Sequence, residues 1–146
     1  GIGDNDNYGK KLTKTAKEML GDKYKGFGIQ PFEKIPEYLN LADIIIIPQK
    51  KNFATVGQIP AKVFDAMAMA KPIIATNVSD LPEILDGCGW IVEPENPEKL
   101  AEAIQNVLKN PKEAEEIGQK ARQKCIEKYS WDAMEEILLN IFKKYE

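Results

Sequence analysis

A glycine, a proline, a lysine and an aspartate lie close together in VGQIPAKVFDAMAMAKPIIAT, residues 56–76. The apolar residues after Pro60 predict a helix, and proline favours the first helical position because its fixed φ suits a helix start. The backbone N–H groups of Ala61, Lys62 and Val63 would then lack intrahelical partners and point back toward the preceding loop. Together with the positive end of the helix dipole, these groups predict an anion site.

Three residues of this stretch indicate which anion could bind. Gly57 lets the backbone approach a ligand closely, and the ammonium group of Lys62 is a point charge suited to phosphate. Asp65 follows Lys62 at a separation of three, on the same face of the predicted helix. Its carboxylate could accept hydrogen bonds from the vicinal hydroxyls of a ribose. The alternative is that Lys62 and Asp65 only form an i,i+3 pair on an otherwise buried helix.

The composition limits the chemistry that the chain can perform. Its 146 residues include no histidine, which removes Ser/His and Cys/His nucleophile systems and most zinc sites. Two cysteines, Cys88 and Cys125, make no disulfide framework and are typical of a reduced, cytoplasmic protein. The formal net charge of −3 argues against nucleic acid as a partner, and no apolar run approaches the roughly 20 residues of a membrane span. Because the chain begins at Gly1 rather than Met, we expect a processed or truncated piece.

Apolar runs and helical stripes predict the elements that position these residues. Runs typical of strands buried on both faces of a parallel sheet occur at residues 44–47, 72–76 and 90–92, and more weakly at 24–28 and at the start of the chain. Helical stripes comprise Leu12, Ala16, Met19 and Leu20; Leu100, Ile104, Val107 and Leu108; and Met134, Ile137, Leu138, Ile141 and Phe142. We therefore predict a single α/β domain over residues 1–146, a Rossmann-like parallel sheet flanked by helices, closed by a helix at 131–146.

Ligands of such sheets bind at the carboxyl ends of the strands. Three loops leave predicted strand ends, at residues 3–9, 28–31 and 48–60, and the last is the longest. We expect one pocket bordered by Gly28–Gln30, by the turn at 57–62 and by Asp65. We also expect that the apolar strand at 44–47 does not remain an unpaired edge, since such edges recruit other chains; without a neighbouring strand, we expect either association between copies or poor solubility.

The order and spacing of these segments resemble a known family. The run ADIIIIPQKKNFATVGQIPAKVFDAMAMAKPIIATNVSDLPEIL, followed by GWIVEPENPEKLAEAI, is similar to the nucleotide-sugar-binding C-terminal domain of GT-B-fold glycosyltransferases of family 4, also called glycosyl transferases group 1. GIGDNDNYGKKL and YSWDAMEEILLNIF extend the resemblance to nearly the whole chain. It implies the C-terminal half of a GT-B fold without its first β-α unit. We therefore expect a fragment of a longer two-domain enzyme, whose N-terminal domain binds the acceptor.

The resemblance also implies roles for individual residues. The family has an E-x7-E pattern whose second acid binds the ribose hydroxyls, and that position falls on Asp65. Gly57 stands in the place of the first acid, so the sequence instead resembles the variant with G-x-P-x-K before the acid, in which Lys62 and backbone amides face the phosphates. The family's base contacts fall on Gly28–Gln30, and its Gly-rich turn falls on Gly1 and Gly3. The implied donor-binding residues are Gly3, Gly28, Ile29, Gln30, Gly57, Pro60, Ala61, Lys62, Val63 and Asp65.

By the same resemblance, the chain is the donor-binding domain of a retaining glycosyltransferase that transfers a sugar from a nucleotide-sugar to a glycan or lipid acceptor. No cofactor and no metal ion are expected, and the full-length protein is expected in the cytoplasm, with a peripheral membrane location left open. The catalytic residues are unknown, and we expect no sugar transfer by this chain alone. Two alternatives remain: a non-catalytic nucleotide-binding or regulatory module of the same fold, and a generic flavodoxin-like interaction domain. The second leaves Gly57, Pro60, Lys62 and Asp65 unexplained.

Overall fold

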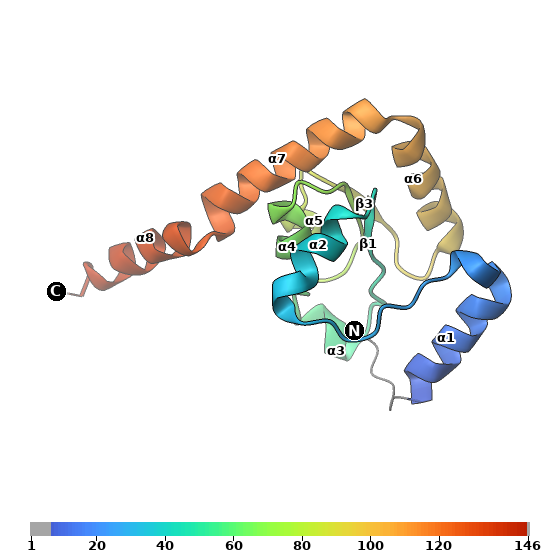
Figure 1. Cartoon of the computed structure of the whole chain (residues 1–146). Helices are drawn as coiled ribbons and strands as arrows, with labels where there is room; N and C mark the ends of the chain where they lie inside the picture. The colour runs from blue at the N-terminus through green and yellow to red at the C-terminus, as the bar shows by residue number, and fades with distance from the viewer. Residues whose placement is uncertain (1–6, 146) are drawn as a thin grey trace. The chain divides into compact units, whose positions relative to one another are not determined.

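The computed structural model describes residues 7–145 of the chain (Figure 1). The chain divides into two compact units, Gly1–Glu37 and Tyr38–Glu146, and each is described by itself. None of the described helices is long and apolar enough to cross a membrane.

The first unit is built around helix α1 (Asn7–Leu20), which confirms the helix predicted from the first apolar stripe. Short 3₁₀ turns follow at Gly21–Lys23 and Phe32–Lys34, and α2 (Ile35–Asn40) continues into the second unit. The weak strand prediction at 24–28 is wrong, because no strand forms there. Gly28 has a φ of 62°, in the left-handed region, which ends the extended conformation. The predicted strand at the start of the chain lies outside the described residues.

The second unit contains the parallel sheet. Its strands β1 (Ile45–Ile47), β2 (Ile73–Thr76) and β3 (Trp90–Val92) lie in the order β1-β2-β3 and confirm three strand predictions. In the register, Ile47 is opposite Ala75, and Ala75 is opposite Ile91. Every residue of β2 is buried, as expected for a central strand of a parallel sheet. On its other side, β1 pairs with no strand of residues 38–145, so its expected association stays a prediction.

Helices cover both faces of this sheet, so the doubly wound α/β prediction is confirmed. On one face, Ile73 and Ala75 of β2 share a core with α4 (Lys62–Ala68), α5 (Leu81–Ile84) and α7 (Pro111–Tyr129). On the other face, Ile74 packs with Val107 of α6 (Pro97–Lys109) and with Ala114 at the start of α7. The alternation along β2 follows from the two-residue period of a strand. Two hydrophobic layers therefore hold the strands in place.

Close contact between α4 and α7 fixes the helix that carries Lys62 and Asp65. A Cβ atom at Gly118 of α7 would lie 2.2 Å from the carbonyl oxygen of Ala70, so only glycine fits there. Ala70, just after α4, has a φ of 53°. The guanidinium of Arg122 on α7 donates to the carbonyl oxygen of Ala68. The C-terminal end of α4 is thus held by the backbone and side chains of α7.

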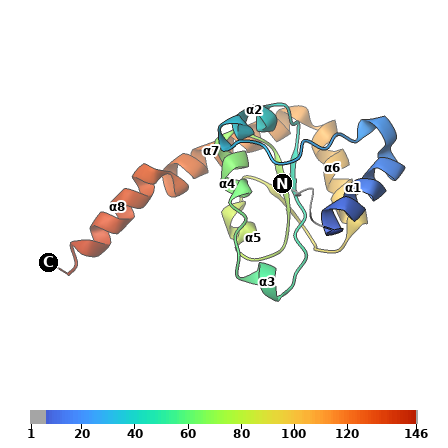
Figure 2. The same ribbon diagram turned by 60° about the horizontal axis from the view of Figure 1, so that its bottom comes forward.

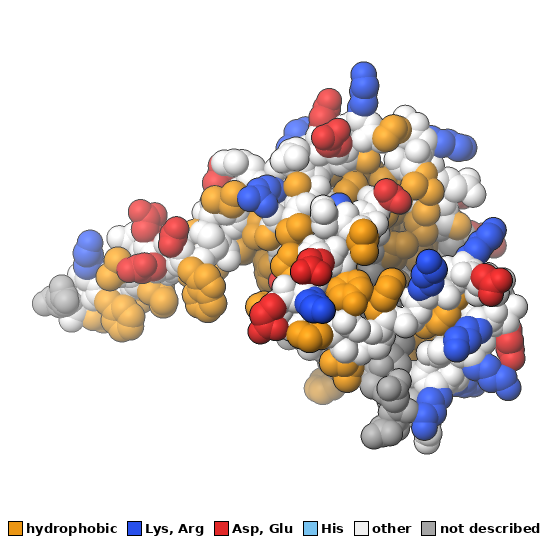
Figure 3. Space-filling view, viewed as in Figure 1, with side chains coloured by type: hydrophobic (Ala, Val, Ile, Leu, Met, Phe, Trp, Pro, Cys, Tyr) orange, Lys and Arg blue, Asp and Glu red, His pale blue; other side chains and the backbone are white. Residues whose placement is uncertain are grey.

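Helix α8 (Trp131–Phe142) begins at Ser130, whose Oγ accepts a hydrogen bond from the N–H of Ala133 at 3.2 Å. This helix confirms the prediction of a helix near the C-terminus. None of its residues is buried, however, and it extends away from the sheet (Figures 1 and 2). Hydrophobic side chains cover one side of α8 in Figure 3. Its apolar stripe therefore lacks a cover among the described residues of the second unit.

Both cysteines are buried and free. Burial raises the pKa of the Cys88 thiol above its ordinary value, more than Lys124 lowers it. Burial likewise raises the pKa of Cys125, against the opposing effect of Arg122. Neither thiol has the lowered pKa of a nucleophilic cysteine, so both belong to the core.

Candidate functional site

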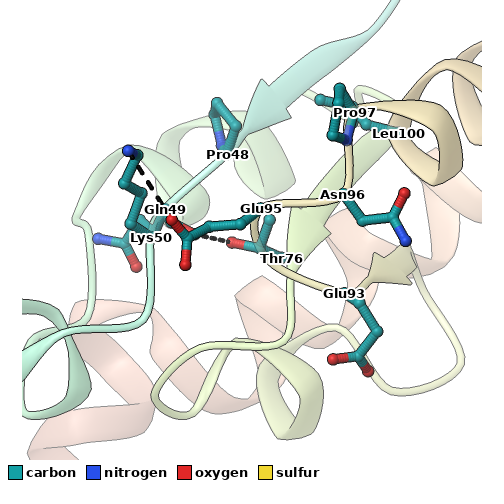
Figure 4. Close-up of a pocket in the computed structure, with 9 residues that line it drawn as sticks. All are labelled: Pro48, Gln49, Lys50, Thr76, Glu93, Glu95, Asn96, Pro97 and Leu100. Atoms are coloured by element: carbon teal, nitrogen blue, oxygen red, sulfur yellow. Dashed lines mark hydrogen bonds and ion pairs between the residues drawn. The ribbon is translucent and has the colours of Figure 1, made fainter.

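A pocket lies where the three strands end. The pocket has a volume of about 370 Å³ and is lined by the residues that directly follow the strands and by the start of α6: Pro48, Gln49, Lys50, Thr76, Glu93, Glu95, Asn96, Pro97 and Leu100 (Figure 4). Its position agrees with the expectation of a site at the carboxyl edge of the sheet. The polar residues of this pocket were not expected as site residues from the sequence. The available signal was their position: Thr76 ends its apolar run, and the others follow the runs at 44–47 and 90–92 within four residues.

The pocket contains charges of both signs. Lys50 and Glu95 point toward one another, with 3.8 Å between Nζ and Oε1 (Figure 4). Glu95 adopts a φ of 58°, an uncommon backbone conformation for a non-glycine residue. The Oγ1 of Thr76 donates to the carbonyl oxygen of Gln49 at 2.8 Å, which ties the loop after β1 to β2. The site therefore offers one cation, carboxylates and amides to a polar ligand.

A metal centre is not indicated in the part of the chain that the structure describes. No group of three or more histidine, cysteine, aspartate or glutamate residues gathers there. The nearby Glu93 carboxylate accepts a hydrogen bond from Asn77 at 3.3 Å instead. Independence from metal ions remains a prediction about the activity.

The loop from β1 to α4 contains a helical turn that the sequence analysis did not predict, α3 (Phe53–Val56). Asn52 caps this turn: its side chain accepts from the N–H groups of Ala54 at 2.9 Å and Thr55 at 3.2 Å. In return, Oγ1 of Thr55 accepts from the N–H of Asn52 at 3.0 Å. This reciprocal capping box is encoded by Asn-x-x-Thr, which could have identified the turn. The loop is therefore a defined structure between the sheet and α4.

The start of α4 differs from the prediction: Pro60 is not the first helical residue, because the helix begins at Lys62 with Ala61 as its N-cap. Pro60 is buried, and its carbonyl oxygen accepts the N–H of Val63 at 3.0 Å, so the prediction that this N–H is free is wrong. The reason is that the chain already turns before α4 with a three-residue hydrogen-bond spacing. The N–H groups of Ala61 and Lys62 have no acceptor among the described residues. Two of the three predicted backbone donors thus remain for an anion.

Lys62 is exposed and Asp65 is half-buried. The described residues form no ion pair between them, so the alternative of a simple i,i+3 pair is not realised. Only one face of the helix is buried, and it consists of Val63, Ala66 and Met67. The lysine and the aspartate lie outside this buried stripe.

Gly57 ends α3 with a φ of −100°, and a Cβ there would meet no atom within 4 Å. The fold therefore leaves open space beside Gly57 and does not itself require glycine. Gly28, Ile29 and Gln30 belong to the first unit, so the predicted pocket between them and Asp65 stays a prediction. Gly3 lies outside the described residues.

The parallel sheet with helices on both faces and a pocket at the carboxyl ends of its strands define an α/β fold of the doubly wound type. A sequence profile described as "Glycosyl transferases group 1" matches residues 2–124. The chain therefore belongs to the glycosyl transferases group 1, a family of enzymes.

One protein is similar in sequence and one solved structure is similar in fold. The chain is 31% identical to alpha-maltose-1-phosphate synthase of Mycolicibacterium smegmatis over 122 residues, which cover 78% of this chain and 30% of that protein. Sucrose-phosphate synthase of Thermosynechococcus elongatus has a similar structure, with a TM-score of 0.82 at 23% identity over 94% of this chain and 34% of that one. The chain thus spans about a third of the length of these relatives.

Two further solved structures are similar. One is the C-terminal domain of a glycosyl transferase group 1 family protein from Francisella tularensis, with a TM-score of 0.67 and 26% identity, covering 85% of this chain and 63% of that one. The other is the Anabaena protein HepE in complex with UDP, with a TM-score of 0.76 and 16% identity, covering 94% of this chain and 37% of that one. The similarity to HepE is a similarity of fold.

Proposed function

We propose that this chain is the C-terminal, donor-binding domain of a retaining glycosyltransferase of family 4. In this proposal, the domain binds a nucleotide-sugar, and the enzyme transfers the sugar to a glycan or lipid acceptor bound by a further domain. Lys62 and the free backbone amides at the start of α4 bind the diphosphate, and Asp65 accepts hydrogen bonds from the ribose. The cation and the amides would stabilise the negative charge of the departing diphosphate without a metal ion.

One observation carries the proposal: Lys62 and Asp65 lie at the start of α4 without pairing with each other. The carboxylate of the half-buried Asp65 has no partner among the described residues, so its oxygens are available to a ligand that supplies hydroxyl donors. The amides of Ala61 and Lys62 lie in the same turn and also lack acceptors among residues 7–145. The UDP bound by the similar structure of HepE supports a nucleotide as this ligand.

Replacing Asp65 with asparagine tests the ribose contact. Asp65→Asn keeps the shape of the side chain but removes its charge and replaces one acceptor oxygen with a donor. We expect nucleoside diphosphates to bind about 10- to 150-fold more weakly, since hydrogen bonds to charged groups contribute roughly 1.5–3 kcal/mol. Titration calorimetry with UDP, GDP and ADP measures the affinity, and Asp65→Glu should lose less because it keeps the carboxylate.

Two controls separate ribose binding from a purely structural role. Thermal unfolding of each variant shows whether the fold is retained. The 2′,3′-dideoxy forms of the same nucleotides lack the hydroxyls, so Asp65→Asn should not weaken their binding further. Unchanged affinity in Asp65→Asn, or an equal loss for ribose and dideoxy compounds, would contradict the assignment of Asp65.

A further inference from the structure

The last residue of β2 is a buried threonine at the carboxyl edge of the sheet. Thr76 is 4% exposed, and cysteines aside it is the one polar residue among those described that is buried. A buried hydroxyl is unfavourable unless it is hydrogen-bonded. The Oγ1 of Thr76 donates to the carbonyl oxygen of Gln49 at 2.8 Å (Figure 4), and a longer contact of 3.4 Å reaches the carbonyl oxygen of Ile47. Both acceptors lie where the chain leaves β1.

Pro48 explains why a side chain makes this link. The parallel ladder places Ile47 opposite Ala75, so the next position along β1, opposite Thr76, is Pro48. Proline has no N–H group to donate, so the ladder cannot continue through it. The chain instead turns, and the N–H of Gln49 donates to the carbonyl oxygen of Ile47 at 3.1 Å, a spacing typical of a γ-turn. The hydroxyl of Thr76 therefore fixes the direction in which the loop from β1 to α4 leaves the sheet.

Gln49 has few other partners at this point. Its side-chain Oε1 is buried and has no hydrogen-bond partner among the described residues. Without the hydroxyl of Thr76, the backbone carbonyl of the same residue would also lose its donor. A buried acceptor without a partner is unfavourable until it reaches water. Loss of the hydroxyl would therefore favour a shift of Gln49 toward solvent.

Further hydrogen bonds connect Gln49 with the segment that leads to α4. The Oγ1 of Thr55 donates to the carbonyl oxygen of Lys50, the residue after Gln49. The N–H of Gln58 donates to the carbonyl oxygen of Thr55 at 3.3 Å, and Pro60, two residues later, is buried. These contacts follow one another along the chain, so the position of Gln49 affects the position of the backbone amides at the start of α4.

We infer that Thr76 is a positioning residue for nucleotide binding. Its hydroxyl holds the loop from β1 to α4 so that the amides of Ala61 and Lys62 meet the diphosphate. This inference rests on the proposed function, and in it Thr76 acts through Gln49 rather than through contact with the nucleotide. The alternative is that the hydroxyl only stabilises the sheet. Its loss would then lower the stability of the fold without changing the affinity of the folded protein.

Two substitutions of Thr76 separate these roles. Thr76→Val removes the hydroxyl and keeps a β-branched side chain, whereas Thr76→Ser keeps the hydroxyl and removes a buried methyl group. Nucleoside diphosphates should bind about 3- to 10-fold more weakly to Thr76→Val, the effect of one hydrogen bond on the fraction of molecules that hold the loop in place. Thr76→Ser should keep the affinity within about twofold because the hydrogen bond remains, although the lost methyl group should lower the midpoint of thermal unfolding. Titration calorimetry of the full chain with UDP, GDP and ADP measures the affinities.

Val107→Ala is the matched control for stability. Val107 is 3% exposed and belongs to the hydrophobic layer on the face of the sheet opposite α4. This variant should unfold at a lower temperature because it loses buried methyl groups, but it should bind nucleotides as the unmodified chain does.

Hydrogen exchange reports on the loop without any nucleotide. Amides of residues 49–58 should exchange faster in Thr76→Val than in the unmodified chain or in Thr76→Ser, because the loop opens more often. A saturating nucleotide should reduce this difference, since it binds the closed form of the loop.

The affinity of the unmodified chain distinguishes failure of this inference from failure of the proposed function. Equal affinity of Thr76→Val and the unmodified chain would overturn the role of Thr76 alone. An equal loss in Thr76→Ser or in Val107→Ala would also overturn it, because the hydroxyl would then not be the cause. If the unmodified chain binds none of the three nucleotides, the proposed function is contradicted, and the role of Thr76 with it.

Discussion

Ala70 adopts a left-handed backbone conformation, with a φ of 53°, at the position where helices commonly end in glycine. Its N–H donates to the carbonyl oxygen of Met67 at 3.0 Å, and the N–H of Lys71 donates to Ala66 at 3.1 Å, so the turn is hydrogen-bonded despite the unfavourable φ. A β-carbon costs roughly 1–2 kcal/mol in this conformation. The end of α4 therefore carries local strain that a glycine would not have.

Ala70→Gly should increase the free energy of unfolding by about 0.5–1 kcal/mol, because relief of the strain exceeds the extra entropy of the unfolded glycine. Ala68→Gly is the matched control, since Ala68 is exposed within the same helix. The control should lose about 0.5–1 kcal/mol, as expected for glycine in a helix. Urea unfolding followed by circular dichroism measures both changes, and the same sign for both would contradict this explanation.

At the scale of residues, the sequence predicted Lys62 and Asp65 at the start of a helix after a long loop. It could not predict that the helix begins at Lys62, after a turn that uses the N–H of Val63, because a shift of two residues in a helix start depends on tertiary contacts such as the burial of Pro60. The pocket residues Lys50 and Glu95 meet only because β1 and β3 end at the same edge of the sheet. Such a pairing across the sheet leaves no local pattern in the sequence.

At the scale of elements, the contact between α4 and α7 depends on a single missing side chain. The Cβ of an alanine at position 118 would lie 2.2 Å from the carbonyl oxygen of Ala70 and 2.9 Å from its carbonyl carbon, both backbone atoms. Gly118→Ala should therefore force the helices apart and reduce the free energy of unfolding by about 1–3 kcal/mol. Chemical denaturation monitored by tryptophan fluorescence measures this loss.

Gly57→Ala is the control for that experiment. A Cβ at Gly57 would meet no atom within 4 Å and its φ is −100°, so the substitution should change stability by less than about 0.5 kcal/mol. Under the proposed function, the same variant should bind nucleoside diphosphates more weakly, because the added methyl group would occupy space beside the phosphates. For the Gly118→Ala variant, an unchanged free energy of unfolding would contradict the prediction, because α4 and α7 could then move apart without loss of stability.

Strong periodicity made most elements predictable. The β-branched runs became β1, β2 and β3, and the pairs Asn96-Pro97 and Ser130-Trp131 start α6 and α8. The strand prediction at 24–28 was wrong because a strand forms only beside another strand that pairs with its backbone. In addition, the glycines of this segment favour a strand less than β-branched residues do. The helix α3 was missed because one turn is too short to show a hydrophobic period.

At the scale of the whole molecule, the fold class followed from the order of strands and helices, and the family profile agrees with it over residues 2–124. The division into two units was not expected from the sequence, which shows no linker near Glu37. The chain covers only about a third of the length of these similar proteins. Contacts with the parts that it does not span therefore leave no recognisable pattern in its sequence. The uncovered apolar stripe of α8 illustrates this, since periodicity predicts a buried face but does not identify what buries it.

The lack of buried residues in α8 has a consequence for the dynamics of the chain. A helix of 12 residues is marginal in water without packing, so α8 should open locally while α7, with Ala114, Gly118, Ala121 and Cys125 buried, stays closed. Amide hydrogens of residues 131–142 should therefore exchange with deuterium at close to unprotected rates, whereas those in the middle of α7 should exchange only through global unfolding. Mass spectrometry of peptides from the two helices measures the difference, and equal protection would mean that α8 is covered in solution. With rapid exchange in α8, the chain combines one cooperative folding unit around the sheet with a helix that becomes stably ordered only when another surface packs against it.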